Sequence, residues 1–263
     1  EEKGYSLVRQ ADVVVLASPV FFYNVTAQAK VFIDRCQMFW GRKYKLKLVD
    51  PDIYSRQGFL LAVGASGGKR LFEGVELTAK YFFDAISADY TGSLTYRNVE
   101  DAGDIIPRPE LAQEIQEAVK HLLTPMLNKK SVLFISNKDA CSSQMAAAFV
   151  KDALRGKVRV LTAGVDAAEA VDPDMVRVMA EKNLDLKYRC PQSLDTVWAG
   201  MEKDPHRVIF IGPKEAAPDL PGVSVETWDM AMPETPSLEA VRKLRDEIEA
   251  RVKIRLPGLE VLF

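Results

Sequence analysis

The sequence predicts an α/β protein of two domains, each a three-layer αβα arrangement around a parallel sheet. Three observations lead to this fold class. The chain has 263 residues, 48% of them hydrophobic, which is enough for two packed cores. Short apolar runs alternate with amphipathic stretches along its length, a pattern typical of parallel strands joined by helices. A polar connection containing a proline, residues 124–130, separates two such series.

The first series begins with a buried strand at residues 13–17 and a helix at about 26–39. A strand at 59–63, a helix at about 75–86 and a short strand near 90–94 follow. The series closes with a helix at 109–123, because Leu111, Ile115, Val119 and Leu122 recur at helical spacing. We therefore assign residues 1–125 to the first domain.

The second series starts with a strand at 132–135, a helix at 143–154 and a strand at 158–162. Asp172 is expected to cap a helix that begins at Pro173 and ends near residue 182. Strands at 208–211 and near 223–225 precede a final helix from Ser237 to about residue 253. These elements form a second domain, residues 131–256. The ending "LEVLF" matches the start of a protease site used to remove purification tags, so residues 257–263 are predicted to be a tag remnant.

Composition excludes several classes of partner. The formal net charge is -2, with both signs interspersed, which predicts neither a nucleic-acid nor a membrane partner. The longest apolar runs are too short to span a bilayer, and no signal segment opens the chain, so we expect a cytoplasmic protein. Three cysteines without a CxxC pair and two distant histidines argue against a disulfide framework and a metal site.

Two loops of the first domain follow strand ends, where open α/β sheets bind ligands. One, "SPVFFYN", carries aromatic residues suited to a planar ring, and the other, "VGASGG", has small residues that let backbone amides approach a ligand. Each loop taken alone could be an ordinary turn. Together they resemble the flavodoxin-like NAD(P)H-dependent FMN reductases, especially the branch of iron-sulfur flavoproteins, over about residues 11–123.

That resemblance implies FMN as cofactor, NAD(P)H as electron donor and a homo-oligomer with flavin at the subunit interface. The flavin-contacting positions that it implies are Ser18, Pro19, Val20, Phe21, Phe22, Asn24, Gly64, Ala65, Ser66, Gly67 and Gly68. The family's first strands and phosphate-binding loop would precede Glu1, so the flavodoxin-like domain is expected to be incomplete at its N-terminus. Any cysteine ligands of an iron-sulfur cluster would also lie there.

The stretch "SNKDACSSQMAAAF" opens the second domain as a strand, a small polar loop and a helix. It resembles the low-molecular-weight tyrosine phosphatases and related arsenate reductases, whose loop reads Cys-x5-Arg-Ser, and the resemblance extends over about residues 131–250. Ser136 stands at the position of the nucleophilic cysteine and Ser142 at that of the anion-binding arginine. Asp139 replaces an asparagine, which predicts a negative charge inside the anion cradle. Met232 occupies the position of the general acid, so a non-catalytic domain is expected.

The three cysteines are expected to be unreactive. Cys36, within a predicted helix, is expected to be a buried inert thiol rather than a reactive one. Cys141 matches a cysteine that does not attack substrate in some arsenate reductases. A redox role for Cys141, alone or paired with Cys190, is the less favoured reading because no cation lies beside it in sequence.

These observations favour an FMN-dependent NAD(P)H oxidoreductase fused to a phosphatase-like pseudoenzyme domain that serves interaction with a protein partner, regulation or assembly. The alternative is a binding or scaffold protein in which neither domain turns over substrate. A third hypothesis is an active phosphatase or arsenate reductase that uses an unconventional residue. The sequence names neither the electron acceptor nor the ligand of the second domain.

Overall fold

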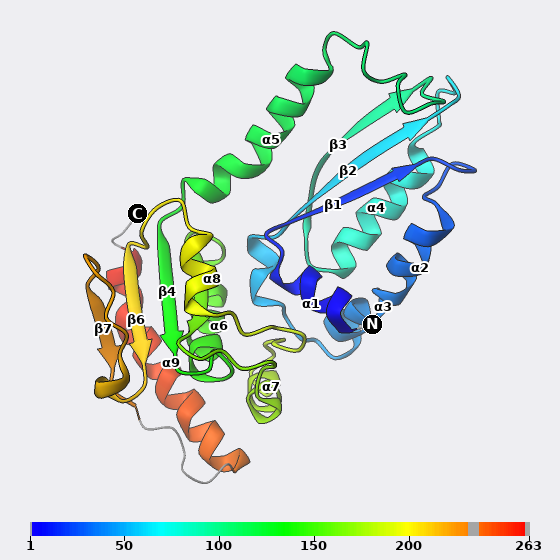
Figure 1. The fold of residues 1–263 in the computed structure, drawn as a ribbon. Helices are drawn as coiled ribbons and strands as arrows, with labels where there is room; N and C mark the ends of the chain where they lie inside the picture. Colours follow the sequence, from blue (N-terminus) through cyan, green and yellow to red (C-terminus); the bar gives the residue numbers. More distant parts are fainter. Residues whose placement is uncertain (1, 231–236, 261–263) are drawn as a thin grey trace. The chain divides into compact units, whose positions relative to one another are not determined.

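The computed structural model describes residues 2–230 and 237–260. The chain forms two compact units (Figure 1). The first contains Leu7–Lys47 and Asp52–Asn128, and the second contains the remaining described residues, among them Leu48–Pro51. Each unit is α/β with a parallel sheet, which confirms the predicted fold class.

The first unit has a three-stranded parallel sheet in the order β1-β2-β3. Helix α4 covers one face and α5 lies over the other (Figure 1). The strands are β1 (Val13–Pro19), β2 (Gln57–Gly64) and β3 (Asp89–Arg97). The boundary between the two units falls within α1 (Glu2–Gln10). The other helices are α2 (Ala27–Arg35), α3 (Gln37–Trp40), α4 (Glu73–Ala85) and α5 (Leu111–Leu127). A π-helical turn at Gly41–Lys45 and a 3-10 turn at Pro51–Tyr54 are also present.

Three helical features of this unit differ from the sequence prediction. Helix α1 was not predicted. The helix predicted at 26–39 starts at the cap Thr26, but it is split at Cys36, whose side chain is fully buried, and continues to Lys45. Helix α5 continues through Pro125, which shortens the predicted connection to residues 128–130. A proline in the last turn removes only one N–H bond, and the apolar pattern continues beyond it.

The second unit has a four-stranded parallel sheet in the order β5-β4-β6-β7. Its strands are β4 (Ser131–Ser136), β5 (Arg159–Gly164), β6 (Arg207–Ile211) and β7 (Val225–Trp228). Its helices are α6 (Ser142–Leu154), α7 (Pro173–Ala180), α8 (Leu194–Ala199) and α9 (Leu238–Glu260), with a 3-10 turn at Lys214–Ala216. Asp172 caps α7 as predicted, because its side chain accepts hydrogen bonds from two backbone amides.

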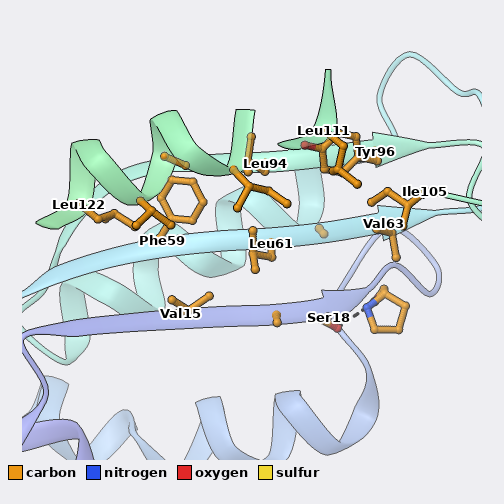
Figure 2. A pocket seen from close by; sticks show the side chains of 16 residues that line it. Val15, Ser18, Phe59, Leu61, Val63, Leu94, Tyr96, Ile105, Leu111 and Leu122 are labelled. Atoms are coloured by element: carbon orange, nitrogen blue, oxygen red, sulfur yellow. Dashed lines mark hydrogen bonds between the residues drawn. The ribbon is translucent and has the colours of Figure 1, made fainter. Parts of the chain in front are cut away.

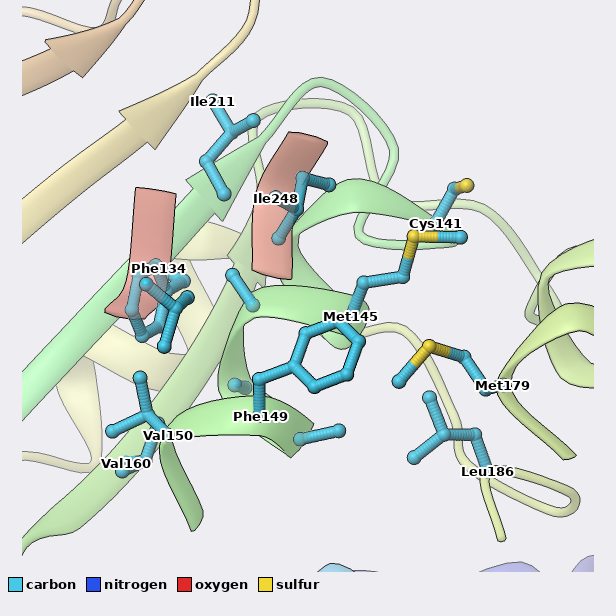
Figure 3. Packing of buried hydrophobic residues seen from close by; sticks show 14 of the residues in the cluster. Phe134, Cys141, Met145, Phe149, Val150, Val160, Met179, Leu186, Ile211 and Ile248 are labelled. Atoms are coloured by element: carbon cyan, nitrogen blue, oxygen red, sulfur yellow. The ribbon is translucent and has the colours of Figure 1, made fainter. Parts of the chain in front are cut away.

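Buried side chains fill both faces of this sheet. The larger cluster includes Phe134, Met145, Met179 and Ile248 (Figure 3), and Phe134 lies edge-on to Trp228 with ring centroids 5.8 Å apart. A smaller cluster lies on the α8 side of the sheet. The last strand starts two residues later than predicted. Helix α9 runs beyond residue 253 and through Pro257, so residues 257–260 of the predicted tag remnant are helical.

Candidate functional sites

The loop after β1 folds into a two-residue hairpin. Phe21 and Asn24 exchange backbone hydrogen bonds of 2.9 and 3.0 Å. The two residues between them, Phe22 and Tyr23, have φ angles of 48° and 63°. Such turns favour asparagine and glycine, because larger side chains are strained in the left-handed region. Strain of this kind is often found at functional sites.

The hairpin presents its aromatic side chains to solvent. Phe22 is fully exposed, and Phe21 and Tyr23 are 61% and 56% exposed. The Asn24 side chain anchors the turn by accepting from Val25 N at 2.8 Å and Thr78 Oγ1 at 3.0 Å. A helix residue also matters here, because a Cβ on Gly74 would lie 2.2 Å from the Tyr23 carbonyl oxygen. The loop is therefore held at its base while its rings stay free.

The glycine loop after β2 lies beside this hairpin. A Cβ on Gly68 would lie 4.0 Å from the Tyr23 hydroxyl, and the Gly68 carbonyl accepts from Arg97 Nε at 3.0 Å. Val20 N donates to Val63 O at 2.8 Å, which joins the two strand ends. Ala65, Ser66 and Gly67 are exposed. The structure thus brings the two predicted ring-contacting loops together, and Tyr23 belongs with them although the sequence prediction omitted it.

Two of the predicted contacts, Ser18 and Gly64, are buried rather than open to a ligand, and Ser18 shows why. It is 6% exposed, its hydroxyl donates to Pro19 O at 2.8 Å and it accepts from Thr26 N at 3.1 Å. These bonds fix the turn from β1 into α2. Its contacts are those of a residue that shapes the loop.

An apolar groove of about 600 Å³ lies between the sheet of the first unit and α5 (Figure 2). Val15, Phe59, Leu61 and Leu94 line its sheet side, and Val15 remains 48% exposed. In the described part of the chain, β1 pairs only with β2, so its other edge has no strand partner. An open strand edge beside an apolar face can accept another chain segment. The sequence indicated the apolar stripe of α5 that lines the other side, but not the groove itself.

In the second unit, the loop between β4 and α6 encloses a hydrogen-bond network. Ser136 Oγ lies 2.9 Å from Ser143 Oγ and accepts from Asp139 N at 3.1 Å. Ser143 Oγ donates to Asp139 Oδ1 at 2.7 Å. The proton of Ser136 is therefore directed to Ser143, since the proton of Ser143 is directed to Asp139. The Ser143 hydroxyl thus connects Ser136 to the Asp139 carboxylate. The sequence did not indicate this connection.

The Asp139 carboxylate lies behind the loop and not in its mouth. It is fully buried and also accepts from Gln192 N at 2.9 Å and Thr162 Oγ1 at 3.1 Å. Burial raises its pKa to about 6, while these hydrogen bonds act in the opposite direction. The residue has φ of 51°, as expected where asparagine is usual. The carboxylate that was expected to face the anion cradle is instead part of the hydrogen-bond network that supports the loop.

A cavity of about 640 Å³ opens at the mouth of this loop. Its lining includes Ser136, Cys141, Ser142 and Asp172, with Phe210, Ile211, Pro213 and Ala216 forming an apolar wall. Cys141 is 8% exposed, and burial, with the nearby Asp172 charge, raises the pKa of its thiol to about 12. Burial likewise raises the pKa of Cys36 to about 12. Met232 lies outside the described residues.

Other classes of site are not evident in the residues that the structure describes. No group of three or more histidine, cysteine, aspartate or glutamate side chains could hold a metal ion within the described ranges. No described helix is long and apolar enough to cross a membrane.

Each half of the chain matches a known protein family. Residues 2–87 match the model of the NADPH-dependent FMN reductase family, and residues 131–202 match that of the low-molecular-weight phosphotyrosine protein phosphatases. A putative arsenate reductase of Halobacterium salinarum is 32% identical over 45% of this chain and 85% of its own length. Arsenate reductase 1 of Bacillus cereus is 31% identical over 49% of this chain and 95% of its own length.

A crystal structure of arsenate reductase from Archaeoglobus fulgidus shares 30% identity, covering 48% of this chain and 98% of that one, with a TM-score of 0.42. Because the chain is 32% identical to a relative of which it covers 85%, its second half belongs to the low-molecular-weight phosphatase and arsenate reductase family; in its first half, residues 2–87 match the NADPH-dependent FMN reductase model.

Proposed function

We propose that this protein is a cytoplasmic FMN-dependent oxidoreductase that takes electrons from NAD(P)H, and that its phosphatase-like domain does not catalyse a reaction. The observation that carries this proposal is the meeting of the aromatic hairpin and the glycine loop beside Tyr23 and Gly68. Both loops follow the carboxyl ends of adjacent parallel strands, where α/β proteins bind cofactors.

The residues present fit the flavin ring. Three exposed aromatic side chains offer flat apolar surfaces, and the small residues opposite leave room for a ring to approach the backbone. The first turn of α4, with Glu73 and Glu76, is less suited to a phosphate. When bound, FMN would supply hydride acceptance and electron transfer. This chain's role is to hold and orient the ring between the loops.

Flavin titration tests the proposal directly. Addition of FMN to the whole chain should perturb the visible flavin spectrum saturably, and NADPH should then bleach it. Phe22→Ala should weaken FMN binding roughly tenfold, the loss of about one aromatic contact. Tyr81→Ala removes another exposed ring, 64% exposed, from the middle of α4 and should leave affinity unchanged. A wild-type chain that leaves the FMN spectrum unaltered would refute the proposal.

The second domain lacks the chemistry for phosphoryl or arsenate turnover. The Ser136 hydroxyl is engaged by Ser143 and Asp139, and Ser142 provides no cation to stabilise an oxyanion. Asp139, the nearest base, is itself held by several donors. We expect no hydrolysis of an aryl phosphate and no reduction of arsenate. Activity abolished by Ser136→Ala would establish instead an unconventional enzyme.

A second candidate function is a binding or scaffold protein, which the apolar groove and the strand edge of β1 favour. Both features suit a homo-oligomer or a different protein partner. Light scattering distinguishes these arrangements. A colourless protein that stays colourless with FMN and forms a defined assembly would favour the scaffold over the oxidoreductase.

A further inference from the structure

The backbone of the loop between β4 and α6 faces its cavity with hydrogen-bond donors. The carbonyls of Ser136, Asn137, Lys138 and Ala140 all accept hydrogen bonds, of 2.8–3.1 Å, from the segment between β5 and α7. In a trans peptide the next N–H points the opposite way. The amides of Asn137, Lys138 and Cys141 therefore turn away from that segment. Within the described ranges, these amides donate to no protein group.

The first turn of α6 adds further donors, because the first amides of a helix have no intrahelical acceptor. Ser142 supplies an independent indication of a ligand. Its side chain is 2% exposed and lines the cavity, yet its hydroxyl makes no hydrogen bond to any residue that the structure describes. The hydroxyl reaches the cavity, where a ligand oxygen would supply the hydrogen-bond partner that the described residues do not provide.

The charges around the cavity disfavour a phosphate-like dianion. The lining has one cationic side chain, Lys138, which is 54% exposed and paired with Asp166 outside the loop. The carboxylate of Asp172 lines the cavity, and that of Asp139 lies behind the loop. Backbone amides at a helix N-terminus ordinarily attract an anion, but the two carboxylates beside this cavity oppose one, which favours ligand oxygens that carry no full charge.

We propose that this cavity binds an uncharged small molecule with several hydroxyl groups. Its oxygens accept from the loop amides and Ser142, one hydroxyl donates to Asp172, and its less polar side packs against Phe210 and Ile211. This site is independent of flavin binding. It assigns a ligand-binding role to a domain that has no catalytic assignment in the proposed function.

A pair of probes that differ in charge tests this inference. Boric acid at pH 7 is neutral, carries three hydroxyl groups and has no stereochemistry, and inorganic phosphate at pH 8 is its anionic counterpart. Backbone amide NMR of the whole chain should show saturable shifts for residues 137–143 with boric acid. Phosphate should bind at least about tenfold more weakly. Shifts with neither probe, or tighter phosphate binding, would overturn the proposal.

Substitution of Ser142 sharpens the test. Ser142→Arg restores a bidentate cation, so phosphate binding should tighten at least about tenfold while boric acid binding weakens. Ser224→Arg adds the same charge at an exposed position and should change neither affinity. Ser142→Ala, a smaller change, should weaken boric acid binding without favouring phosphate. Unchanged selectivity in a folded Ser142→Arg protein would contradict the charge argument.

Discussion

The loop after β1 and the loop after β4 both follow the carboxyl end of a parallel strand. The first exposes its side chains to solvent, whereas the second buries them in hydrogen bonds. The hairpin of the first unit leaves Phe22 fully in solvent and strains its own backbone to do so. The loop of the second unit engages Ser136, Ser143 and Asp139 in one buried network. The comparison teaches that a loop with small polar residues in place of the family's cysteine and arginine need not be loose, because those residues can satisfy one another.

The two sheets also differ in how completely buried side chains cover their faces. The sheet of the second unit has buried clusters on both faces, whereas that of the first unit retains a groove beneath α5. The sheet of the first unit is therefore the less completely packed of the two. Four predictions test this contrast.

The largest effect is expected at Arg56 in the first unit. Its guanidinium is 1% exposed and donates to Arg9 O at 3.0 Å, Ala11 O at 3.1 Å and Ile86 O at 2.9 Å. Arg56→Met leaves these carbonyls without their donor, so the free energy of unfolding should fall by about 3 kcal/mol or more. Chemical denaturation measures this. The exposed Lys80→Met is the matched control, and an equal loss in both variants would show that Arg56 has no special role.

The next largest effect concerns Asp139 in the second unit. Its pKa is raised from an ordinary 3.8 to about 6 by folding, so the folded protein holds the proton more tightly. This contribution to stability is present below about pH 4 and is lost as pH rises through about 6. Asp139→Asn avoids burying the charge and should be more stable than wild type at pH 8, by up to about 3 kcal/mol.

Thermal denaturation across pH 4–8 checks the Asp139 prediction. The difference between wild type and Asp139→Asn should shrink to near zero at pH 4, where the aspartic acid is protonated. A difference that is constant with pH would locate the effect in packing and not in ionisation.

A smaller effect is expected at Gly74, which allows the hairpin to approach α4. A Cβ there would lie 2.2 Å from Tyr23 O, so Gly74→Ala must displace the hairpin and should cost about 2 kcal/mol. FMN binding should weaken in the same variant. Gly103→Ala has open space around the added methyl group and serves as the control. Wild-type stability of Gly74→Ala would mean that the hairpin is not held by this contact.

The smallest effect is expected at Phe22, where substitution should increase the free energy of unfolding. Phe22→Gly relieves a left-handed conformation and should raise the free energy of unfolding by about 1 kcal/mol while weakening FMN binding. Denaturation and flavin titration of one preparation measure both quantities. Opposite changes would indicate that the strained turn is retained for ligand contact, and a loss of stability would show that Phe22 supports the fold.

The sequence by itself determined much of the architecture. The strands and helices of the second unit were predicted with few errors, because alternation of apolar runs and a good cap such as Asp172 are local signals. It also indicated the loops after β1 and β2 as candidate flavin contacts, and the serines at positions 136 and 142. It missed α1, α8, the split at Cys36 and the continuation of α5 past Pro125, where the local pattern is short, weak or contradictory.

Only the tertiary structure decided where the functional groups point. The position of Asp139 behind its loop depends on Thr162 and Gln192, which are distant in sequence and supply the buried acceptor with donors. The direction of the loop amides likewise depends on the segment between β5 and α7. Residue type is local information, whereas the pairing of buried polar groups is a property of the assembled chain.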